Sequence, residues 1–445
     1  MSAPYKQWFR PDTEETSSVF KCSPNAVLAR GAFGSVSFGI FQGTTGAIWK
    51  CTAIKAISSD GSSANTSKFF QSNTNAKNNL SHETFHEVCA LRLLNPHCNI
   101  IDLWWFSQSA NELEVAFPYR VDLGTTLEWR RQQRKTPFLL PRAVVRGIAW
   151  DLFSALEHCH AHGVLHLDVK PGNLLVDTSS GHMQLCDFGL ATPFEINAEK
   201  DDNGPPKKKE EAAKKGLCTL YYRPPENILR SQTVAPASDV YSAAVVLGEL
   251  LAGFPLFRGT TDLGQLQAIF QCLGTPVESS SSSPAEPSQQ LPDFMNDDDG
   301  SSGAKLNFSS KQRQKLDSLL PRAKESPHLL PLLERLLVLN PTVRPSASNV
   351  LGDAYFTTQT TTTIDRSTMQ RELVPGVLRE PVILSNPHND VSVATKKASS
   401  MVAARKAHEK SLQKWAGANK PFRTCKTTFQ STIYCAAKSA IVAAS

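Results

Sequence analysis

Two short polar motifs that lie close together in the chain constrain it more than any other feature. Residues 166–173 read HLDVKPGN, and residues 186–189 read CDFG. The first motif brings a carboxylate (Asp168), an ammonium (Lys170) and an amide (Asn173) within six residues. The second adds another carboxylate directly after a short apolar run of strand type. Two polar turns on an inert scaffold would also give these letters, so the flanking sequence has to separate a structural from a chemical interpretation.

The chemistry that needs this set of side chains is phosphoryl transfer from ATP. One carboxylate orients the attacking hydroxyl, a cation neutralises the moving phosphate, and an amide and a second carboxylate hold magnesium. In order and spacing the two motifs resemble the catalytic and metal-binding loops of protein kinases. The resemblance implies that Asp168 orients the substrate hydroxyl and that Lys170 contacts the γ-phosphate. It assigns Asn173 and Asp187 to Mg²⁺.

A glycine-containing segment lies far upstream, at residues 28–36 (LARGAFGSV). Two glycines three apart suit a hairpin whose backbone closes over phosphates, because side chains there would block that approach. An ordinary hairpin turn is the alternative for the glycine pair alone. The segment resembles the kinase glycine-rich loop, with alanine in place of its usual first glycine. The resemblance assigns these residues to nucleotide binding: Leu28, Ala29, Gly31, Ala32, Phe33, Gly34 and Val36.

The sequence CTAIKAI at residues 51–57 alternates as a strand does and resembles the kinase Val-Ala-Ile-Lys strand. The resemblance implies that Lys55 contacts the α- and β-phosphates and that Ala53 faces the adenine. Lys50 falls outside the motif frame and is interpreted as a solvated strand lysine. Both Lys55 and Asp168 are therefore assigned to the reaction by motif rather than by composition.

A helix is predicted over residues 83–94, where apolar side chains recur at helical spacing. The segment resembles the kinase αC helix, whose glutamate pairs with the strand lysine and holds it on the phosphates. Glu87 is the first candidate for that role, and Glu83, one turn earlier, is the alternative. The pairing partner of Lys55 therefore stays open between two residues at the sequence level.

The adenine pocket is expected to be completed by the strand at residues 113–120, which leads into the kinase hinge, and by one residue beyond the catalytic loop. Phe117 is interpreted as the bulky residue at the back of the pocket, which is compatible with its being a buried core side chain. Backbone groups around Tyr119 and Arg120 would read the adenine, and Leu175 would form the pocket floor.

The sequence TLYYRPPE at residues 219–226 resembles the end of the activation segment in cyclin-dependent and mitogen-activated protein kinases. The resemblance implies that Thr219 bonds to the Asp168–Lys170 pair. It implies that Arg223 favours proline after the phosphorylated residue. Further residues are assigned structural roles by the same resemblance: a buried ion pair of Glu226 with Arg344, and Asp239 holding the backbone of the catalytic loop.

One departure from the kinase pattern concerns activation. Leu167 stands where kinases commonly have an arginine that binds a phosphate on the activation segment. The segment agrees with this loss, because Thr192 is its only hydroxyl residue between Asp187 and Thr219. The hypothesis is that phosphorylation of the activation segment is not the switch of this protein.

The predicted fold class is α+β: a two-lobed protein kinase fold with a small antiparallel-sheet N-lobe that carries αC, and a larger, mainly helical C-lobe. Ser-, Asn-, Asp- and Lys-rich stretches predict insertions. The predicted boundaries are an N-terminal extension at 1–23, a kinase domain at 24–356 (N-lobe 24–119, C-lobe 120–356, insertions near 58–79, 194–216 and 278–312) and a basic, partly helical tail at 357–445.

Charge and cysteine content limit the setting. The 445 residues carry a net charge of +6, but residues 365–445 alone hold 13 Lys and Arg against 5 Asp and Glu. The kinase-like part is thus near neutral and the tail is basic. Ten cysteines without a CxxC pair favour reduced thiols, and no apolar run reaches membrane-spanning length. A cytoplasmic or nuclear protein is expected, with nucleic acid contacted at most weakly through the tail.

The resemblance as a whole implies an ATP- and Mg²⁺-dependent serine/threonine protein kinase, proline-directed and similar to cyclin-dependent kinases. Its protein substrates would carry Ser-Pro or Thr-Pro sites. A catalytically weak or inactive kinase-fold scaffold that acts through the basic tail is the alternative. A cyclin-like or other regulatory subunit stays open, because residues 81–86 (SHETFH) differ from the helix of typical cyclin partners.

Overall fold

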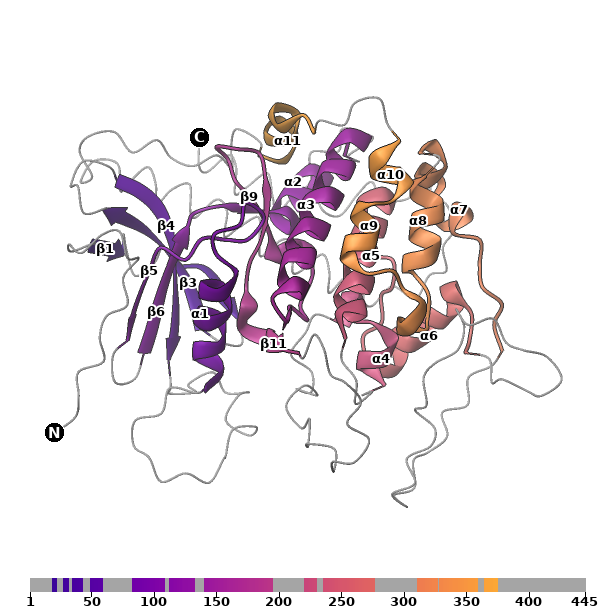
Figure 1. Ribbon diagram of the computed structural model, residues 1–445, viewed down its shortest axis with the longest axis horizontal. Helices are drawn as coiled ribbons and strands as arrows, with labels where there is room; N and C mark the ends of the chain where they lie inside the picture. Colours follow the sequence, from indigo (N-terminus) through magenta and orange to yellow (C-terminus); the bar gives the residue numbers. More distant parts are fainter. Residues whose placement is uncertain are drawn as a thin grey trace, which may run out of the picture.

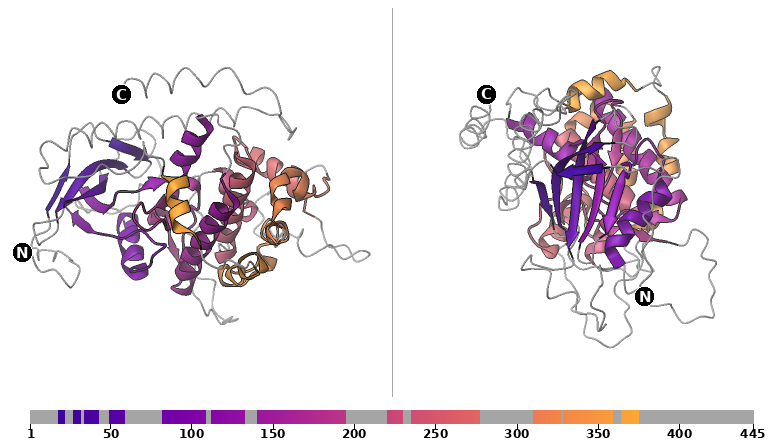
Figure 2. Two further views of the ribbon diagram at one scale, coloured as in Figure 1. Left: turned by 90° about the horizontal axis from the view of Figure 1, so that it is seen from above. Right: turned by 90° about the vertical axis from the view of Figure 1, so that its left-hand side faces the viewer.

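The computed structural model forms two lobes, a twisted antiparallel sheet with one helix and a mainly helical unit, joined by a short connection (Figure 1). Its description covers residues 18–21, 27–31, 34–42, 49–58, 82–108, 112–132, 140–194, 220–229, 235–276, 310–326, 328–358 and 364–374. The views in Figure 2 show the sheet at one end of the molecule and the helices at the other.

The small lobe is built on strands β1 (Ser18–Lys21), β2 (Val27–Gly31), β3 (Gly34–Gln42), β4 (Trp49–Ser58), β5 (Trp105–Gln108) and β6 (Glu112–Pro118). Their order is β1-β3-β4-β6-β5, and β2 pairs with β3. The register places Val36 opposite Lys55, and Ala53 opposite Phe117. Because directly paired residues share a face of the sheet and side chains alternate, these four residues lie on one face.

Helix α1 (His82–Leu94) covers the sheet and continues into the core between the lobes. Val88 packs with Leu113 and Val115 of β6, while Leu91 and Leu94 are fully buried in the main core. Glu87 sits on the same turn as Val88 and is only 2% exposed. The apolar stripe that binds the helix to the sheet therefore also fixes one buried carboxylate.

The large lobe centres on two long helices, α3 (Arg142–Ala161) and α5 (Pro236–Ala252). The apolar stripe of α3 repeats at helical spacing, and α5 is buried along nearly its whole length, as the middle helix of a bundle must be. Around them lie α2 (Leu123–Gln132), α4 (Pro225–Ile228), α6 (Asp262–Leu273), α7 (Leu316–Leu319), α8 (Leu329–Leu336), α9 (Ala347–Leu351), α10 (Ala354–Thr357) and α11 (Arg366–Leu373).

Short strands carry the polar motifs at the junction of the lobes. β7 (Val121–Asp122) pairs with β9 (Leu174–Val176), which pairs with β10 (Met183–Leu185). β8 (Val164–Leu165) pairs with β11 (Thr192–Pro193). The catalytic-loop sequence thus runs from β8 to β9, and residues 186–189 follow β10. The first motif ends where β9 begins and the second begins where β10 ends. Because Leu174 pairs with Leu185 in the antiparallel register, both motifs lie at the same end of this sheet.

The structure confirms the predicted fold class, an antiparallel small lobe with a helix and a mainly helical large lobe. The helix expected at 83–94 is α1. The domain boundaries stay predictions, since most of the insertions and of the tail lie outside the described residues. Helix α11, beyond residue 356, packs on the large lobe. In the described part of the chain, every helix is too short or too polar to span a membrane.

Candidate active site

The catalytic-loop residues form one hydrogen-bonded unit. The Lys170 ammonium lies 2.5 Å from Asp168 Oδ2. Asn173 donates from Nδ2 to the same carboxylate oxygen at 3.0 Å and to the Asp168 carbonyl at 2.8 Å. Asp168 and Asn173 are 5% and 4% exposed, so both are held in place, and Asn173 lines the pocket between the lobes. The carboxylate, the cation and the amide that the sequence placed within six residues therefore point to one place.

Two further side chains fix the backbone of this loop. Asp239, at the start of α5, accepts the backbone N–H of His166 at 2.9 Å and of Leu167 at 2.8 Å. Leu167 has φ +63°, a left-handed conformation that costs free energy for a non-glycine residue. The two bonds to a fully buried carboxylate offset that cost. The role expected for Asp239 as the holder of the loop backbone is confirmed by this geometry.

His166 ties the catalytic loop to the second motif. The N–H of Asp168 donates to His166 Nδ1 at 3.2 Å, so the other ring nitrogen carries the proton. That nitrogen, Nε2, donates to the Cys186 carbonyl at 3.0 Å. The ring also meets Phe188 edge-on, with centroids 4.8 Å apart. Since Phe188 is fully buried, Asp187 is fixed from both sides in its left-handed conformation (φ +63°).

Lys55 joins the small lobe to this unit. Its Nζ lies 2.6 Å from Glu87 Oε2 and 2.8 Å from Asp187 Oδ1. The strand lysine thus pairs with Glu87, the first of the two candidates; the side chain of Glu83 lies outside the described residues. Three charged groups from β4, α1 and the segment after β10 meet at one point, which requires both lobes to be in register.

The charges of this network reinforce one another. Burial lowers the pKa of Lys55, but the attraction of Glu87 and Asp187 outweighs it and raises that pKa above its ordinary value. Burial opposes ionisation of Asp187 as well, yet the attraction of Lys55 and its hydrogen bond lower the pKa of Asp187 to about 2. An ammonium and an ionised carboxylate therefore face the pocket at any physiological pH.

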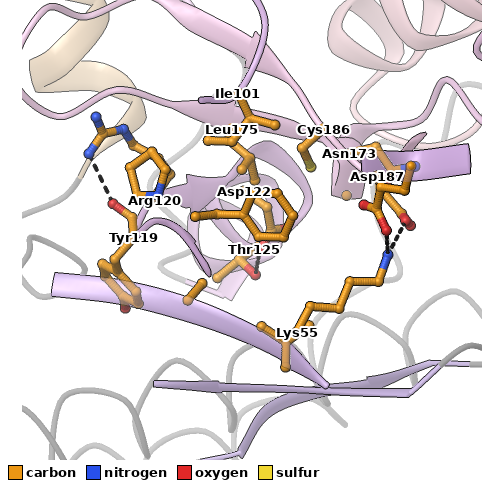
Figure 3. Close-up of a pocket in the computed structure, with 16 residues that line it drawn as sticks. Lys55, Ile101, Tyr119, Arg120, Asp122, Thr125, Asn173, Leu175, Cys186 and Asp187 are labelled. Carbon is orange, nitrogen blue, oxygen red and sulfur yellow. Dashed lines mark hydrogen bonds and ion pairs between the residues drawn. The ribbon is translucent and has the colours of Figure 1, made fainter. Parts of the chain in front are cut away.

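Next to these charges lies a pocket between the lobes, drawn in Figure 3. Its walls include Val36, Ala53, Phe117, Tyr119 and Leu175, all predicted to bind the nucleotide. Arg120 lines it too, and its guanidinium donates to the Tyr119 carbonyl at 3.1 Å and lies 3.1 Å from Asp177. Figure 3 shows an apolar end near Leu175 and Ile101 and a charged end at Lys55 and Asp187. Such a division suits a flat base joined to an anionic chain.

Several pocket residues were not found by sequence reasoning. Asp122 caps α2, accepting the N–H of Thr125 at 2.8 Å and its hydroxyl at 2.7 Å, and both residues line the pocket. The spacing Asp-x-x-Thr before a helix was a usable signal for the cap. Ile101 and Cys186 also line the pocket. Ile101 comes from an irregular segment that no local pattern marks, whereas Cys186 directly precedes Asp187 in the second motif but was assigned no role.

For some predicted residues the structure gives less. Leu28, Ala29, Gly31 and Gly34 lie in β2 and β3, and their side chains are outside the description. The pairing of Gly31 with Gly34 does show that the glycines flank a tight β2–β3 connection. Ala32, Phe33 and Thr219 lie outside the described residues. The roles of all these residues stay predictions.

The donor set fits a magnesium ion. Mg²⁺ prefers oxygen ligands, usually one or two carboxylates together with substrate phosphates. Asp187 offers an ionised carboxylate whose side chain is 37% exposed. The amide nitrogen of Asn173 is used by Asp168, which leaves the amide oxygen as the atom suited to a cation. Asp187 and Asn173 are therefore the residues that would hold the ion.

Below the pocket, a buried ion pair ties the end of the activation segment to the large lobe. Arg344 reaches Glu226 through both terminal nitrogens, at 2.6 and 2.9 Å, and both side chains are at most 1% exposed. This is the pair expected from the sequence. Arg223, nearby in the chain, lies 3.2 Å from Asp262 at the start of α6. The segment after residue 219 is thereby fixed against α5 and α6.

Comparison with known proteins agrees with this geometry. The family model described as protein kinase domain matches residues 26–356, about three quarters of the chain. The chain belongs to the protein kinase family. Within this kinase domain the matched segment contains Lys55, Glu87, Asp168, Asn173 and Asp187, the residues that meet at the pocket.

Among curated proteins, the kinase is similar to mitogen-activated protein kinase 15 of rat, with 32% identity over 275 residues. The protein of the same name from mouse is 31% identical over the same length. The alignments cover 61% of this chain and 45% of each relative. The kinase therefore spans less than half the length of these relatives, which belong to the same group of kinases as the cyclin-dependent ones. The resemblance inferred from the motifs is confirmed at this level.

Proposed function

We propose that this protein is an ATP-dependent serine/threonine protein kinase that transfers the γ-phosphoryl group to protein hydroxyls. The observation that carries the proposal is the joining of Lys55, Glu87 and Asp187 beside the Asp168–Lys170–Asn173 unit. The contacts of Lys55 with Glu87 and Asp187 link elements far apart in the chain. A scaffold that had lost catalysis would have no chemical need to keep all of them, so the geometry favours the enzyme over the scaffold.

In the proposed reaction a new bond forms between the substrate oxygen and the γ-phosphorus, and the bond from that phosphorus to ADP breaks. Asp168 orients the hydroxyl and takes its proton, and Lys170 neutralises charge on the transferred group. Lys55, held by Glu87, contacts the α- and β-phosphates. Asn173 and Asp187 would hold Mg²⁺, which would supply positive charge against the phosphate chain. The adenine lies between Ala53 and Leu175, with Phe117 behind it and Tyr119 and Arg120 at the hinge.

Preference for serine or threonine followed by proline is part of the proposal. Lys170, two residues after Asp168, is typical of serine/threonine kinases, and the similar curated proteins are mitogen-activated protein kinases. Arg223 is buried and lies beside Asp262 at the end of the activation segment, where the residue after the phosphorylation site would lie. Thr219 would complete the contact between substrate and the Asp168–Lys170 pair.

The test is phosphate incorporation from radiolabelled ATP by the full-length protein on a peptide library. The library compares Ser-Pro, Ser-Ala, Thr-Pro and Tyr centres. Wild type should label Ser-Pro and Thr-Pro peptides, and Asp168→Asn should reduce the rate by about 100- to 1,000-fold. Asp317→Asn, the same change on the large-lobe surface, should leave the rate unaltered. Equal labelling by wild type and Asp168→Asn would contradict the proposal.

We further propose that the kinase does not need a phosphate on its activation segment. Leu167 cannot bind a phosphate, and Thr192 lies in β11, paired with Leu165 of β8. Its hydroxyl donates to the Leu190 carbonyl at 3.4 Å, so it is engaged within the segment. Protein made in bacteria should keep its activity after phosphatase treatment. A loss of most of the rate, restored by an activating kinase, would refute this part.

A further inference from the structure

Helix α11 lies beyond the segment that the family model matches, yet it contacts α3, the β9–β10 turn and α2, and α2 contributes Thr125 to the pocket wall. Figure 1 shows it above α2 and close to β9, and the view from above in Figure 2 places it across the large lobe beside the junction of the lobes. Asp365 caps its first turn, accepting the N–H groups of Ser367 and Thr368. The helix is thus locally well formed and is placed by its contacts.

The first contact is an ion pair with α3. Arg366 lies 2.5 and 2.8 Å from the two carboxylate oxygens of Asp151, whose side chain is fully buried. Asp151 also accepts the N–H of Met183 in β10 at 2.9 Å. One turn later, Met369 covers Gly147 so closely that a Cβ there would lie 2.6 Å from its sulfur. Charge and shape together seat the helix on α3 and β10.

The second contact is with the turn that joins β9 and β10. Gln370 donates from Nε2 to the carbonyls of Ser179 at 2.7 Å and Thr178 at 3.1 Å. At Gly181 (φ +74°) a Cβ would lie 2.5 Å from the Arg366 carbonyl, so the turn and the helix are in close contact. The same turn carries Asp177, the partner of the pocket-lining Arg120.

The third contact is with α2. Thr126 donates its hydroxyl to the Leu373 carbonyl at 2.7 Å, a bond that is fully buried. Arg130 donates to the Glu372 carbonyl and lies 3.1 Å from its carboxylate. Thr126 is adjacent to Thr125, which lines the pocket and bonds to Asp122. The end of α11 therefore fixes the first turn of α2, which forms one wall of the pocket.

We propose that α11 is a positioning element for nucleotide binding, acting through the β9–β10 turn on Arg120 and through α2 on Asp122. Gln370 is its main positioning residue, since both of its bonds go to the turn that holds the hinge arginine. This inference rests on the proposed function, because it assigns the pocket to a nucleotide. Weakening α11 should lower affinity for ATP and leave the chemistry at Asp168 and the binding of peptide unchanged.

The experiment measures two quantities on the full-length protein: the Kd of ATP by titration with a fluorescent ATP analogue and competing ATP, and the steady-state constants for ATP and peptide. Gln370→Glu is the sharpest variant, because it has the same size but sets a carboxylate against two carbonyls. Gln370→Lys restores a donor. Arg371→Ala is the matched control, since Arg371 lies on the same helix, 65% exposed at its side chain, with its recorded contacts within the helix.

The expected result is a three- to tenfold rise in Kd and KM for ATP in Gln370→Glu, about the loss of one or two hydrogen bonds. In Gln370→Glu, kcat, the KM for peptide and the melting temperature should be unaltered. Gln370→Lys should recover the affinity for ATP, and Arg371→Ala should not change it. Wild-type affinity for ATP in Gln370→Glu would overturn the inference, and so would a parallel fall in kcat and melting temperature. If wild type itself binds no ATP, the proposed function fails instead.

Discussion

Two ion pairs in this kinase have the same shortest distance and very different surroundings. Lys55 and Glu87 lie 2.6 Å apart at the wall of the pocket, and Arg344 and Glu226 lie 2.6 Å apart inside the large lobe. Lys55 has a second carboxylate partner that is 37% exposed, whereas Arg344 and Glu226 are almost completely buried. The first pair faces a space where phosphates would lie, and the second faces only protein.

The difference separates function from stability. Arg344 uses its remaining N–H groups on the carbonyls of Val338, Leu339 and Ala237, and its guanidinium lies over the Tyr241 ring. Every donor group of this arginine is engaged, so the pair has no group left for a ligand. Lys55 is held by two carboxylates but keeps a pocket-facing side, so it can share its charge with an anion. A fully buried ion pair therefore serves the fold, whereas an ion pair that faces a pocket can also interact with a ligand.

Breaking the buried pair should give the largest effect on stability. In Arg344→Ala the carboxylate of Glu226 stays buried with only the Ser238 hydroxyl as a partner. We expect a loss of about 3–5 kcal/mol in the free energy of unfolding. Urea unfolding followed by far-UV circular dichroism measures it. Arg344→Lys keeps the charge but loses the two-pronged contact with the carboxylate, so its free energy of unfolding should lie between those of wild type and Arg344→Ala. A loss below about 1 kcal/mol in Arg344→Ala would contradict this view of the pair.

Breaking the pocket pair should instead cost activity. Lys55→Met should lower the rate of phosphate transfer by about 100- to 1,000-fold, because the phosphates lose their fixed cation. The free energy of unfolding should fall by less than in Arg344→Ala, because Glu87, although only 2% exposed, lines the pocket, whereas Glu226 is enclosed by protein. Lys324→Met, on an exposed lysine of the large lobe, is the matched control for both assays. A variant that unfolds as readily as Arg344→Ala would show that the two pairs do not differ.

Acid should also act on a histidine at the junction of α1 and α3. His97 stacks on His158 at 4.2 Å and accepts the N–H of Asn99 through Nδ1, which requires a neutral ring. Burial, and then the charges of His158 and His162, lower the pKa of His97 to about 4. The pKa of Asp187 is about 2, so the carboxylate beside Lys55 stays ionised above pH 4.

The direction in which stability changes with pH follows from the lowered pKa of His97. Between about pH 6.5 and 4 the unfolded chain takes up a proton at this ring and the folded chain does not, so stability falls as the pH falls through that window. After allowance for solvent screening at a half-buried ring, the contribution is about 1 kcal/mol. His97→Asn keeps an acceptor for Asn99. This variant should lose the pH-dependent contribution, measured as the difference between urea midpoints at pH 7 and 4.5. His328→Asn, at the start of α8, should not.

The smallest effect is expected at an exposed ion pair. Arg335 of α8 pairs with Asp353, but its side chain is 54% exposed. Because water screens such a pair and competes for its charges, Arg335→Ala should change the free energy of unfolding by less than about 0.5 kcal/mol. The same urea titration measures this change, so that it can be compared with the change in Arg344→Ala. A cost similar to that of Arg344→Ala would mean that burial does not explain the difference between ion pairs in this lobe.

The sequence predicted the parts of the site that are written as short motifs. Lys55, Asp168, Asn173 and Asp187 each stand in a local pattern of strand or turn whose spacing follows from the chemistry, and the structure brings them together. It could not choose between Glu83 and Glu87, because the two residues lie one helical turn apart in the sequence. The strand register and the packing of Val88 decided in favour of Glu87.

What the sequence alone determined, then, is the family, the two-lobed fold and the four residues above, because local order carries that information. What only the tertiary structure decided are contacts between segments without any shared pattern. Asp122 and Ile101 meet in the pocket wall, His97 meets His158, and α11 reaches the turn after β9 from more than 180 positions away. Such pairs depend on how whole elements pack, so no short stretch of the chain records them.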